Sequence, residues 1–379
     1  MNSFTHYMPT HIIMGDDALE RFAAVSPRTE RAIIVTSQPV YDHARDALHR
    51  FMETLETHGV TYTVFDEFEA PLEKADIFRG GKVAREHNAD VIIGFGGGRV
   101  LDLAKLIARF THESTETFDA WMLSKEVPPF DQDALPTVMV PTSLNNASAF
   151  NPKAFIHDRR NDRRVRFKHV SLFPRAALVA PSFYATLSRV ALESAIANLF
   201  VRSVELLIAQ ESVHRTLIAK DALGLLIRSI TANEEDHYAR LAHVAMRINT
   251  QTMRKPLFPL HQINDAIEGV HPTLPFCAFV NNALMPYFNW RIDAMSEKAH
   301  SELKEAFANT PYYSNNVYVC IKQFVDSFAT TRAPLERHGV EAAQISDYTV
   351  HLKTIYPDFN ALEDSALYAI MEEVLITSH

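Results

Sequence analysis

The sequence contains only two cysteines among 379 residues, Cys277 and Cys320, and no Cys-x-x-Cys pair. This scarcity excludes a disulfide framework and a thiolate zinc site, and it fits the reducing cytoplasm. No apolar run reaches the roughly 18 residues that a membrane-spanning helix needs. The first residues lack the basic region and apolar stretch of a signal peptide. We therefore expect a cytoplasmic protein with no membrane partner.

An excess of positive charge is also missing. The chain has 37 Lys and Arg residues against 46 Asp and Glu residues, which gives a net charge of −9. This balance argues against nucleic acid or an anionic membrane surface as a partner. A hydrophobic content of 47% and a charged content of 22% are ordinary for a soluble globular protein. A chain of this length is expected to form two domains.

The two halves of the chain show different patterns. In the first half, short apolar or β-branched runs alternate with amphipathic stretches, which predicts a parallel sheet covered by helices. The expected strands are 32–35, 61–65, 90–95 and 138–140, and the expected helices are 75–87 and 101–110. After about residue 180 the patterns are helical, at 190–210, 220–231 and 238–250. We therefore predict an α/β Rossmann-like nucleotide-binding domain at 1–178 and an all-α domain at 179–379.

Three consecutive glycines are the sharpest feature of the sequence. Gly96, Gly97 and Gly98 follow an expected buried strand and precede an expected helix. Glycines let the backbone turn tightly and approach a ligand closely, and a helix start offers N–H groups and a positive dipole end to a phosphate. Asp102 and Lys105 lie three residues apart, on roughly one face of that helix. A turn without a ligand is the alternative, but it would not need three flexible residues.

The pattern Gly-Gly-Gly-x-x-x-Asp-x-Ala-Lys resembles the pyrophosphate-binding signature of the iron-dependent (group III) alcohol dehydrogenases. Four weaker matches follow in the family's order, at 9–15, 140–142, 286–289 and 360–364, so the resemblance covers nearly the whole chain. It implies the architecture shared with dehydroquinate synthase, a bound NAD or NADP, and a divalent metal in the helical domain. It also implies a homodimer, for which the strand-like segment 3–13 is a candidate contact.

The resemblance assigns further residues to the cofactor. Ser37 stands where the family often has an Asp that binds the adenosine ribose, so NADP is permitted. Arg99 replaces the usual Ser after the glycines and offers a phosphate contact. Thr142, Ser143 and Asn146 lie in the family's Pro-Thr loop, which here lacks its glycines and its Glu, although Asn tolerates left-handed backbone. For Ser37 and Arg99, the alternative is a solvent-facing loop residue.

The family's metal site is largely replaced. The family's Asp and His, four residues apart on one helix, correspond to Asn198 and Arg202. Its third ligand corresponds to His261, and its fourth falls at Phe276. One ligand of four remains, and a guanidinium opposes a cation, so we predict no catalytic metal. The maleylacetate reductases, a subgroup that works without metal, also carry Asn at the first position.

A metal-free reductase remains chemically reasonable. Arg202 would stabilise the alkoxide that forms when hydride reaches a carbonyl, and His261 would protonate it. The alternative for Arg202 is a structural ion pair with Glu205 or another carboxylate, through which Arg202 fills the vacated site. A shifted metal site built from His261, Asp265 and His271 is also conceivable, but ordinary hydrogen bonds for Asp265 and His271 are favoured.

The sequence thus predicts an NAD(P)-dependent oxidoreductase that acts on a small alcohol, aldehyde or ketone. The basic run 158–168 favours an anionic substrate, although a solvated basic face explains it as well. Two alternatives stay open. The first is a non-catalytic member that keeps the fold and nucleotide binding. The second is a lyase or cyclase like dehydroquinate synthase, whose metal ligands and lysines are not found here.

Overall fold

A computed structural model describes residues 6–124, 127–209, 212–231, 236–251, 259–274, 278–329, 335–356 and 364–376. The chain divides into two compact units, an α/β unit at His6–Leu187 and a helical unit that begins at Ser188. Across the described ranges, no helix has both the length and the apolar character that a bilayer crossing requires.

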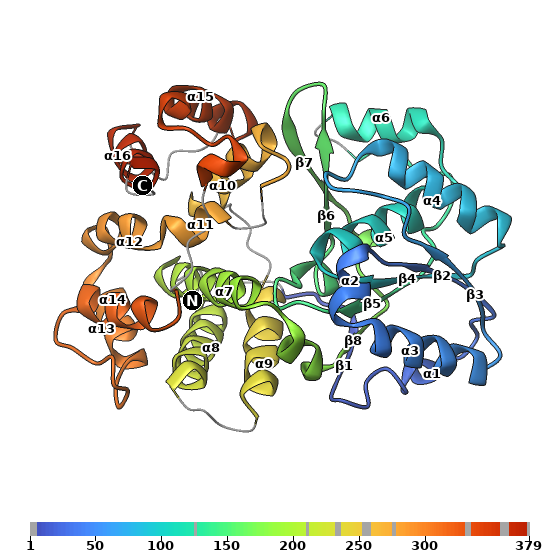
Figure 1. Ribbon diagram of the computed structural model, residues 1–379, viewed down its shortest axis with the longest axis horizontal. Helices are drawn as coiled ribbons and strands as arrows, with labels where there is room; N and C mark the ends of the chain where they lie inside the picture. Colours follow the sequence, from blue (N-terminus) through green and yellow to red (C-terminus); the bar gives the residue numbers. More distant parts are fainter. Residues whose placement is uncertain are drawn as a thin grey trace. The chain divides into compact units, whose positions relative to one another are not determined.

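The α/β unit is built on one parallel sheet of six strands (Figure 1). Its strands, in spatial order, are β1 (His11–Met14), β8 (Ala176–Val179), β5 (Thr137–Pro141), β4 (Val91–Gly96), β2 (Arg31–Val35) and β3 (Thr61–Phe65). The central strands are continuous apolar runs because helices cover both of their faces. The predicted strands are confirmed. β1, within the segment suggested as a dimer contact, pairs with β8 of the same chain, and the dimer stays a prediction.

Helices connect the strands and cover the sheet. They are α1 (Phe22–Val25), α2 (Gln38–His43), α3 (Arg45–Thr57), α4 (Lys74–Glu86), α5 (Gly98–Phe110) and α6 (Thr115–Leu123), with the 3-10 turns η1 (Ala147–Ala149), η2 (Val170–Leu172) and η3 (Pro181–Thr186). The chain moves from β2 to β3 in one direction and from β3 back to β4 in the other. Because such crossovers are right-handed, α3 and α4 lie on opposite faces of the sheet (Figure 1). An antiparallel hairpin, β6 (Lys153–Asp158) with β7 (Arg163–Lys168), stands apart from the sheet.

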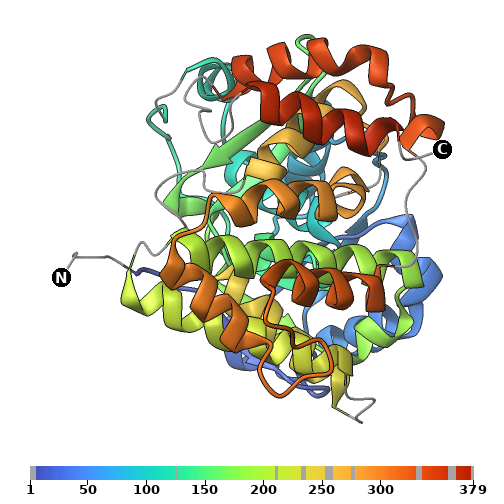
Figure 2. The same ribbon diagram turned by 90° about the vertical axis from the view of Figure 1, so that its left-hand side faces the viewer.

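The helical unit packs around one long helix, α7 (Arg189–Ala209), most of whose residues are buried (Figure 2). The other helices are α8 (Val213–Thr231), α9 (His237–Asn249), α10 (Pro259–Val270), α11 (Ala278–Asn282), α12 (Leu284–Asp293), α13 (Glu297–Ala306), α14 (Val317–Phe328), α15 (Ile345–Ile355) and α16 (Asp364–Ile376), with the 3-10 turns η4 (Leu335–His338) and η5 (Ala342–Gln344). α7 contacts α8, α9, α11, α13 and α14. A helix that packs on several sides must be apolar on several sides, as this one is.

Candidate functional site

The carboxyl ends of β2, β4 and β5 lie side by side at one edge of the sheet. The chain reverses its direction of travel across the sheet between β2 and β4, because β3 lies beyond β2 whereas β5 lies beyond β4. Open α/β sheets bind ligands at such a switch point, outside the carboxyl ends of the strands. The glycine turn follows β4 at this edge, and the N–H of Thr142, after β5, donates to the carbonyl of Gly96 over 3.0 Å.

The three glycines of the turn differ in how strongly their surroundings require a glycine. Gly96 ends β4, and a Cβ atom there would lie only 2.7 Å from Val100 Cγ2, so packing requires glycine. At Gly98, the first residue of α5, a Cβ would lie 3.2 Å from the carbonyl oxygen of Asn145. Gly97 caps α5 with φ −76° and ψ 179°, which any residue adopts. A Cβ on Gly97 would have its nearest neighbour, Ser143 Oγ, at 3.7 Å. Neither strain nor packing within the described residues therefore requires glycine at 97.

Asp102 and Lys105 on α5 point into the protein. Lys105 is 1% exposed, and its Nζ donates to the carbonyl oxygens of Asn151 and Lys153 at 2.7 and 2.8 Å. Asp102 accepts from Ser148 Oγ at 2.5 Å. Together they fasten the segment 148–153, which follows the Pro-Thr loop, onto the helix that starts at the glycine turn. Their contacts indicate positioning of this edge rather than a direct ligand contact.

Burial shifts the titration of both groups. It raises the pKa of Asp102 to about 6 and lowers the pKa of Lys105 to about 7, while each partly offsets the shift of the other. A carboxyl whose pKa is higher in the folded than in the unfolded state stabilises the fold when it is protonated. For Asp102, that stabilisation is complete below the ordinary value of 3.8 and is lost as the pH rises through about 6.

We therefore expect Asp102→Asn to change how stability depends on pH. Between about pH 4.5 and about pH 7.5, the wild type should lose on the order of 2–3 kcal/mol relative to the variant, because Asn cannot ionise. Urea unfolding at both pH values measures this difference. Asp46→Asn, at an exposed position of α3, is the matched control and should follow the wild type. Parallel pH profiles for the wild type and Asp102→Asn would contradict the expectation.

The remaining residues assigned to the cofactor lie along the same edge. Ser37 lies between β2 and α2 and is half-buried. Arg99 is exposed on the first turn of α5. Thr142 is buried, and Ser143 is the residue closest to the open side of Gly97. Asn146 is buried, and its Nδ2 donates to the hydroxyl of Tyr184 at 3.3 Å.

In the helical unit, the positions that match the family's metal ligands form a different contact. Nε2 of His261 on α10 lies 2.5 Å from Oδ1 of Asn198 on α7. Because an amide oxygen only accepts, Nε2 carries the hydrogen and is not a lone-pair donor in this arrangement. Arg202 follows Asn198 by one turn, on the same face of α7. Phe276, the fourth position, lies outside the described residues.

A buried cluster that the sequence did not reveal lies further along α7. Glu205 is buried and accepts hydrogen bonds from Tyr287 and from Arg291, whose Nε lies 3.1 Å from Oε1. Burial raises the pKa of Glu205, and Arg291 opposes this rise. The cluster ties α7 to α12, so the carboxylate considered as a partner for Arg202 is held by α12. A sequence feature that could have indicated this cluster is the spacing of Tyr287 and Arg291, which lie one turn apart on α12.

The residues considered for a shifted metal site bind neighbouring helices. Asp265 accepts from the hydroxyl of Tyr356 at 2.7 Å, and Nε2 of His271 lies 2.7 Å from the hydroxyl of Tyr348. Both contacts are ordinary hydrogen bonds, as favoured from the sequence. Over the described part of the chain, no three His, Cys, Asp or Glu side chains group in a way that would hold a metal.

The basic run predicted as a possible anion-binding face forms the β6–β7 hairpin. Arg159 pairs with Glu73 at 2.5 Å, and Arg163 pairs with Asp158 at 3.0 Å. The guanidinium of Arg164 stacks over the ring of Phe155 at 4.4 Å. Two of the six positive charges of this run, those of Arg159 and Arg163, are therefore matched by carboxylates of the α/β unit.

The doubly wound sheet and its glycine turn define the first unit as a dinucleotide-binding type of α/β domain. Residues 9–181 match the family model of the iron-containing alcohol dehydrogenases. A solved alcohol dehydrogenase from Oenococcus oeni has a TM-score of 0.84 at 15% identity and covers 100% of both chains. The fold predicted from the sequence, an α/β domain followed by a helical one, is thus confirmed.

Curated relatives match between 41% and 54% of this chain. An aldehyde-alcohol dehydrogenase of Streptococcus pneumoniae is 29% identical over 169 residues, which are 41% of this chain and 19% of that protein. An NADPH-dependent aldehyde reductase of Escherichia coli is 26% identical over 211 residues, which are 54% of this chain and 52% of that protein. The chain therefore spans about half the length of the second relative and less of the first.

Proposed function

We propose that this protein is an NAD(P)-dependent oxidoreductase that interconverts an alcohol with an aldehyde or ketone by hydride transfer. The observation that carries the proposal is Gly97. It sits at a helix start on the switch point of the sheet, and nothing within the described fold requires a glycine there. The named activities of the relatives, an aldehyde-alcohol dehydrogenase and an NADPH-dependent aldehyde reductase, support the same reading.

The residues at the edge of the sheet suit a dinucleotide. The N–H groups at the start of α5 would hold the pyrophosphate, because the first N–H groups of a helix have no partner within it. Ser143 faces the open side of Gly97, and Arg99 on the first turn adds a positive charge. Asp102 and Lys105 fix the segment after the Pro-Thr loop. When bound, the nicotinamide would supply or accept the hydride.

The helical unit supplies groups that can replace a metal. An amide, a guanidinium and an imidazole with hydrogen on Nε2 do not make a donor set for a divalent cation. Arg202 would stabilise the negative charge that develops on the substrate oxygen, since it is charged at every physiological pH. His261, whose Nε2–H is held by Asn198, would donate a proton to that oxygen from Nδ1 when the imidazole is charged. We therefore propose chemistry without a resident metal.

Gly97→Val tests nucleotide binding directly. We expect the variant to bind NADH or NADPH at least about tenfold more weakly, because its side chain would occupy the space through which the phosphates approach. The loss of fold stability should be only about 1 kcal/mol, the usual cost of a poor N-cap residue. Nucleotide fluorescence titration measures the affinity, and thermal unfolding measures the stability.

Gly96→Val is the contrasting variant, because its side chain would collide with Val100. It should lower stability by more than Gly97→Val does. The proposal would be wrong if the wild type bound neither nucleotide at millimolar concentration, or if Gly97→Val bound as tightly as the wild type.

A further inference from the structure

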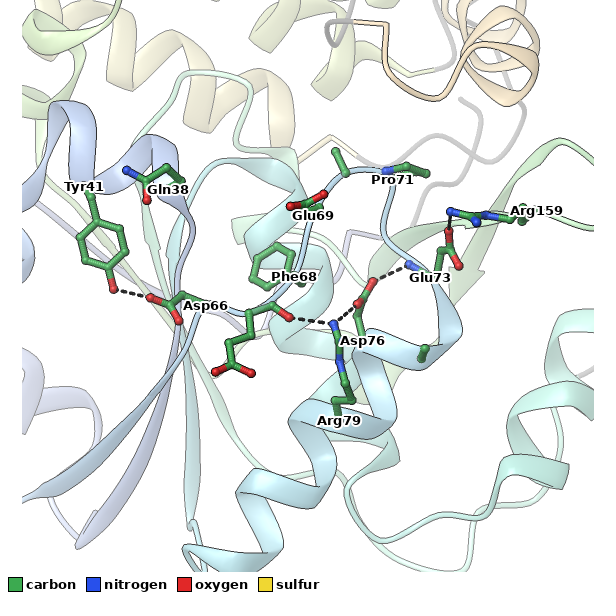
Figure 3. A pocket seen from close by; sticks show the side chains of 13 residues that line it. Gln38, Tyr41, Asp66, Phe68, Glu69, Pro71, Glu73, Asp76, Arg79 and Arg159 are labelled. Carbon is green, nitrogen blue, oxygen red and sulfur yellow. Dashed lines mark hydrogen bonds and ion pairs between the residues drawn. The ribbon is translucent and has the colours of Figure 1, made fainter.

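An open pocket of about 740 Å³ lies at the carboxyl end of β3 (Figure 3). Its lining includes Gln38, which follows Ser37 in the chain. Gln38 and Tyr41 of α2 line one side, and the segment 66–71 lines another. The lining is strongly acidic, with two arginines, Arg79 and Arg159, and five carboxylates: Asp66, Glu67, Glu69, Glu73 and Asp76. All of these residues belong to the α/β unit.

Strand pairing places Asp66 beside the end of β2. Val35 is the register partner of Phe65, and the N–H of Thr36 donates to the carbonyl of Phe65 at 3.1 Å. Asp66 directly follows β3 and Thr36 directly follows β2, so these two residues lie side by side on neighbouring strands, about 5 Å apart. Ser37 is the next residue along, so a ligand that lies on Ser37 has the carboxylate of Asp66 as its neighbour on the β3 side.

Tyr41 holds the carboxylate in place. Its hydroxyl donates to Oδ2 of Asp66 at 2.8 Å (Figure 3). Burial, and then this hydrogen bond, raises the pKa of Tyr41 to about 12, so the hydroxyl remains a donor at physiological pH. Asp66 is exposed. The hydrogen bond from Tyr41 occupies only Oδ2, so Oδ1 can accept a hydrogen bond from a ligand.

The two arginines of the pocket do not compensate the negative charge of Asp66. Arg79 donates to Asp76 at 2.6 Å and to the carbonyl of Glu67 at 2.7 Å. Arg159 pairs with Glu73 at 2.5 Å. Neither arginine pairs with Asp66, so the negative charge of Asp66 remains beside the position where a phosphate on the ribose would project.

We propose that Asp66, positioned by Tyr41, binds the adenosine ribose hydroxyls and selects NAD(H) against NADP(H). This role rests on the proposed nucleotide binding at the glycine turn. A carboxylate accepts hydrogen bonds from the 2′- and 3′-hydroxyls and repels a 2′-phosphate. In this chain the carboxylate would come from the end of β3, while the end of β2 carries the neutral Ser37. The acidic pocket thus revises the expectation that Ser37 alone permits NADP.

The test is the ratio of dissociation constants for NADPH and NADH, measured by fluorescence titration of the full chain. We expect the wild type to prefer NADH by at least about tenfold, and Asp66→Asn to reduce that ratio about tenfold, because the variant removes the charge and keeps the shape. Tyr41→Phe should reduce the ratio by less. Glu69→Gln removes the same charge from the same pocket and is the matched control, for which the ratio should change less than about twofold.

Three results would overturn the proposal. The first is a wild-type preference for NADPH. The second is a ratio that is unchanged in Asp66→Asn, with thermal unfolding showing that the variant is folded. The third is an equal change in Glu69→Gln, which would indicate a diffuse field rather than a contact by Asp66. Failure of the wild type to bind either nucleotide would instead reject nucleotide binding itself, and the role of Asp66 with it.

Discussion

Lys105→Met is expected to lower the free energy of unfolding by about 3–5 kcal/mol, because it leaves two carbonyl acceptors without a donor, at about 1–3 kcal/mol each, and removes a charge that interacts with Asp102. The methionine side chain fills most of the same volume but donates no hydrogen bond. The carbonyl oxygens of Asn151 and Lys153 would each lose a donor now at 2.7 or 2.8 Å. Asp102 would lose the positive charge that offsets part of its burial. Three buried acceptors are therefore affected by one substitution.

Guanidinium unfolding near neutral pH measures this loss. Lys74→Met is a matched control, because Lys74 forms an ion pair with Asp119 at 2.6 Å with side chains that are 34% and 47% exposed. Exposed pairs contribute roughly 0–1 kcal/mol, so this control should change stability little. A loss in Lys105→Met no larger than in Lys74→Met would show that the buried lysine does not hold the segment 148–153.

Arg202→Ala is expected to lower the turnover of an aldehyde or ketone substrate by about 100-fold, the typical effect of removing one preorganised donor from a developing oxyanion. Arg202→Lys should restore only part of the activity, because a lysine keeps the charge but not the planar fork. KM should change less than turnover, since the charge on the oxygen develops only as the hydride is transferred.

Two comparisons make this second expectation specific. Arg247→Ala removes an exposed arginine of α9 that pairs with Asp221, and it should leave turnover unchanged. Metal analysis of the purified protein should find no stoichiometric iron or zinc. Full activity of Arg202→Ala would overturn the catalytic role. One equivalent of metal bound through His261 would overturn the metal-free chemistry, because a dication and a guanidinium a few ångströms apart repel strongly.

The boundaries of helices and strands can be predicted from the sequence where apolar residues follow the regular pattern of a buried strand or an amphipathic helix. The strand at Thr61–Phe65 is predicted correctly because its residues are β-branched or aromatic, which favours strands. The apolar core of β4 is also predicted correctly, because a parallel strand that is buried on both faces is a continuous apolar run. The start of α8 was placed too late, at residue 220 instead of Val213. Val213 and Leu217 are apolar but 62% and 61% exposed, so the first two turns of this helix do not show the apolar face that marks a surface helix.

The glycine turn and the order of strands and helices were determined by the sequence alone, because each depends on residues close together in the chain. The replacement of the family's metal ligands stays a prediction. The roles of Asp102 and Asp66 were not determined by the sequence alone. The sequence places Asp102 in the ligand-binding motif, but its partner is Ser148. Ser148 follows β5 in the chain and reaches α5 only through folding. Asp66 carried no signal, because only the pairing of β2 with β3 places it beside Ser37. Long-range partners are set by packing and strand register, which local sequence patterns do not encode.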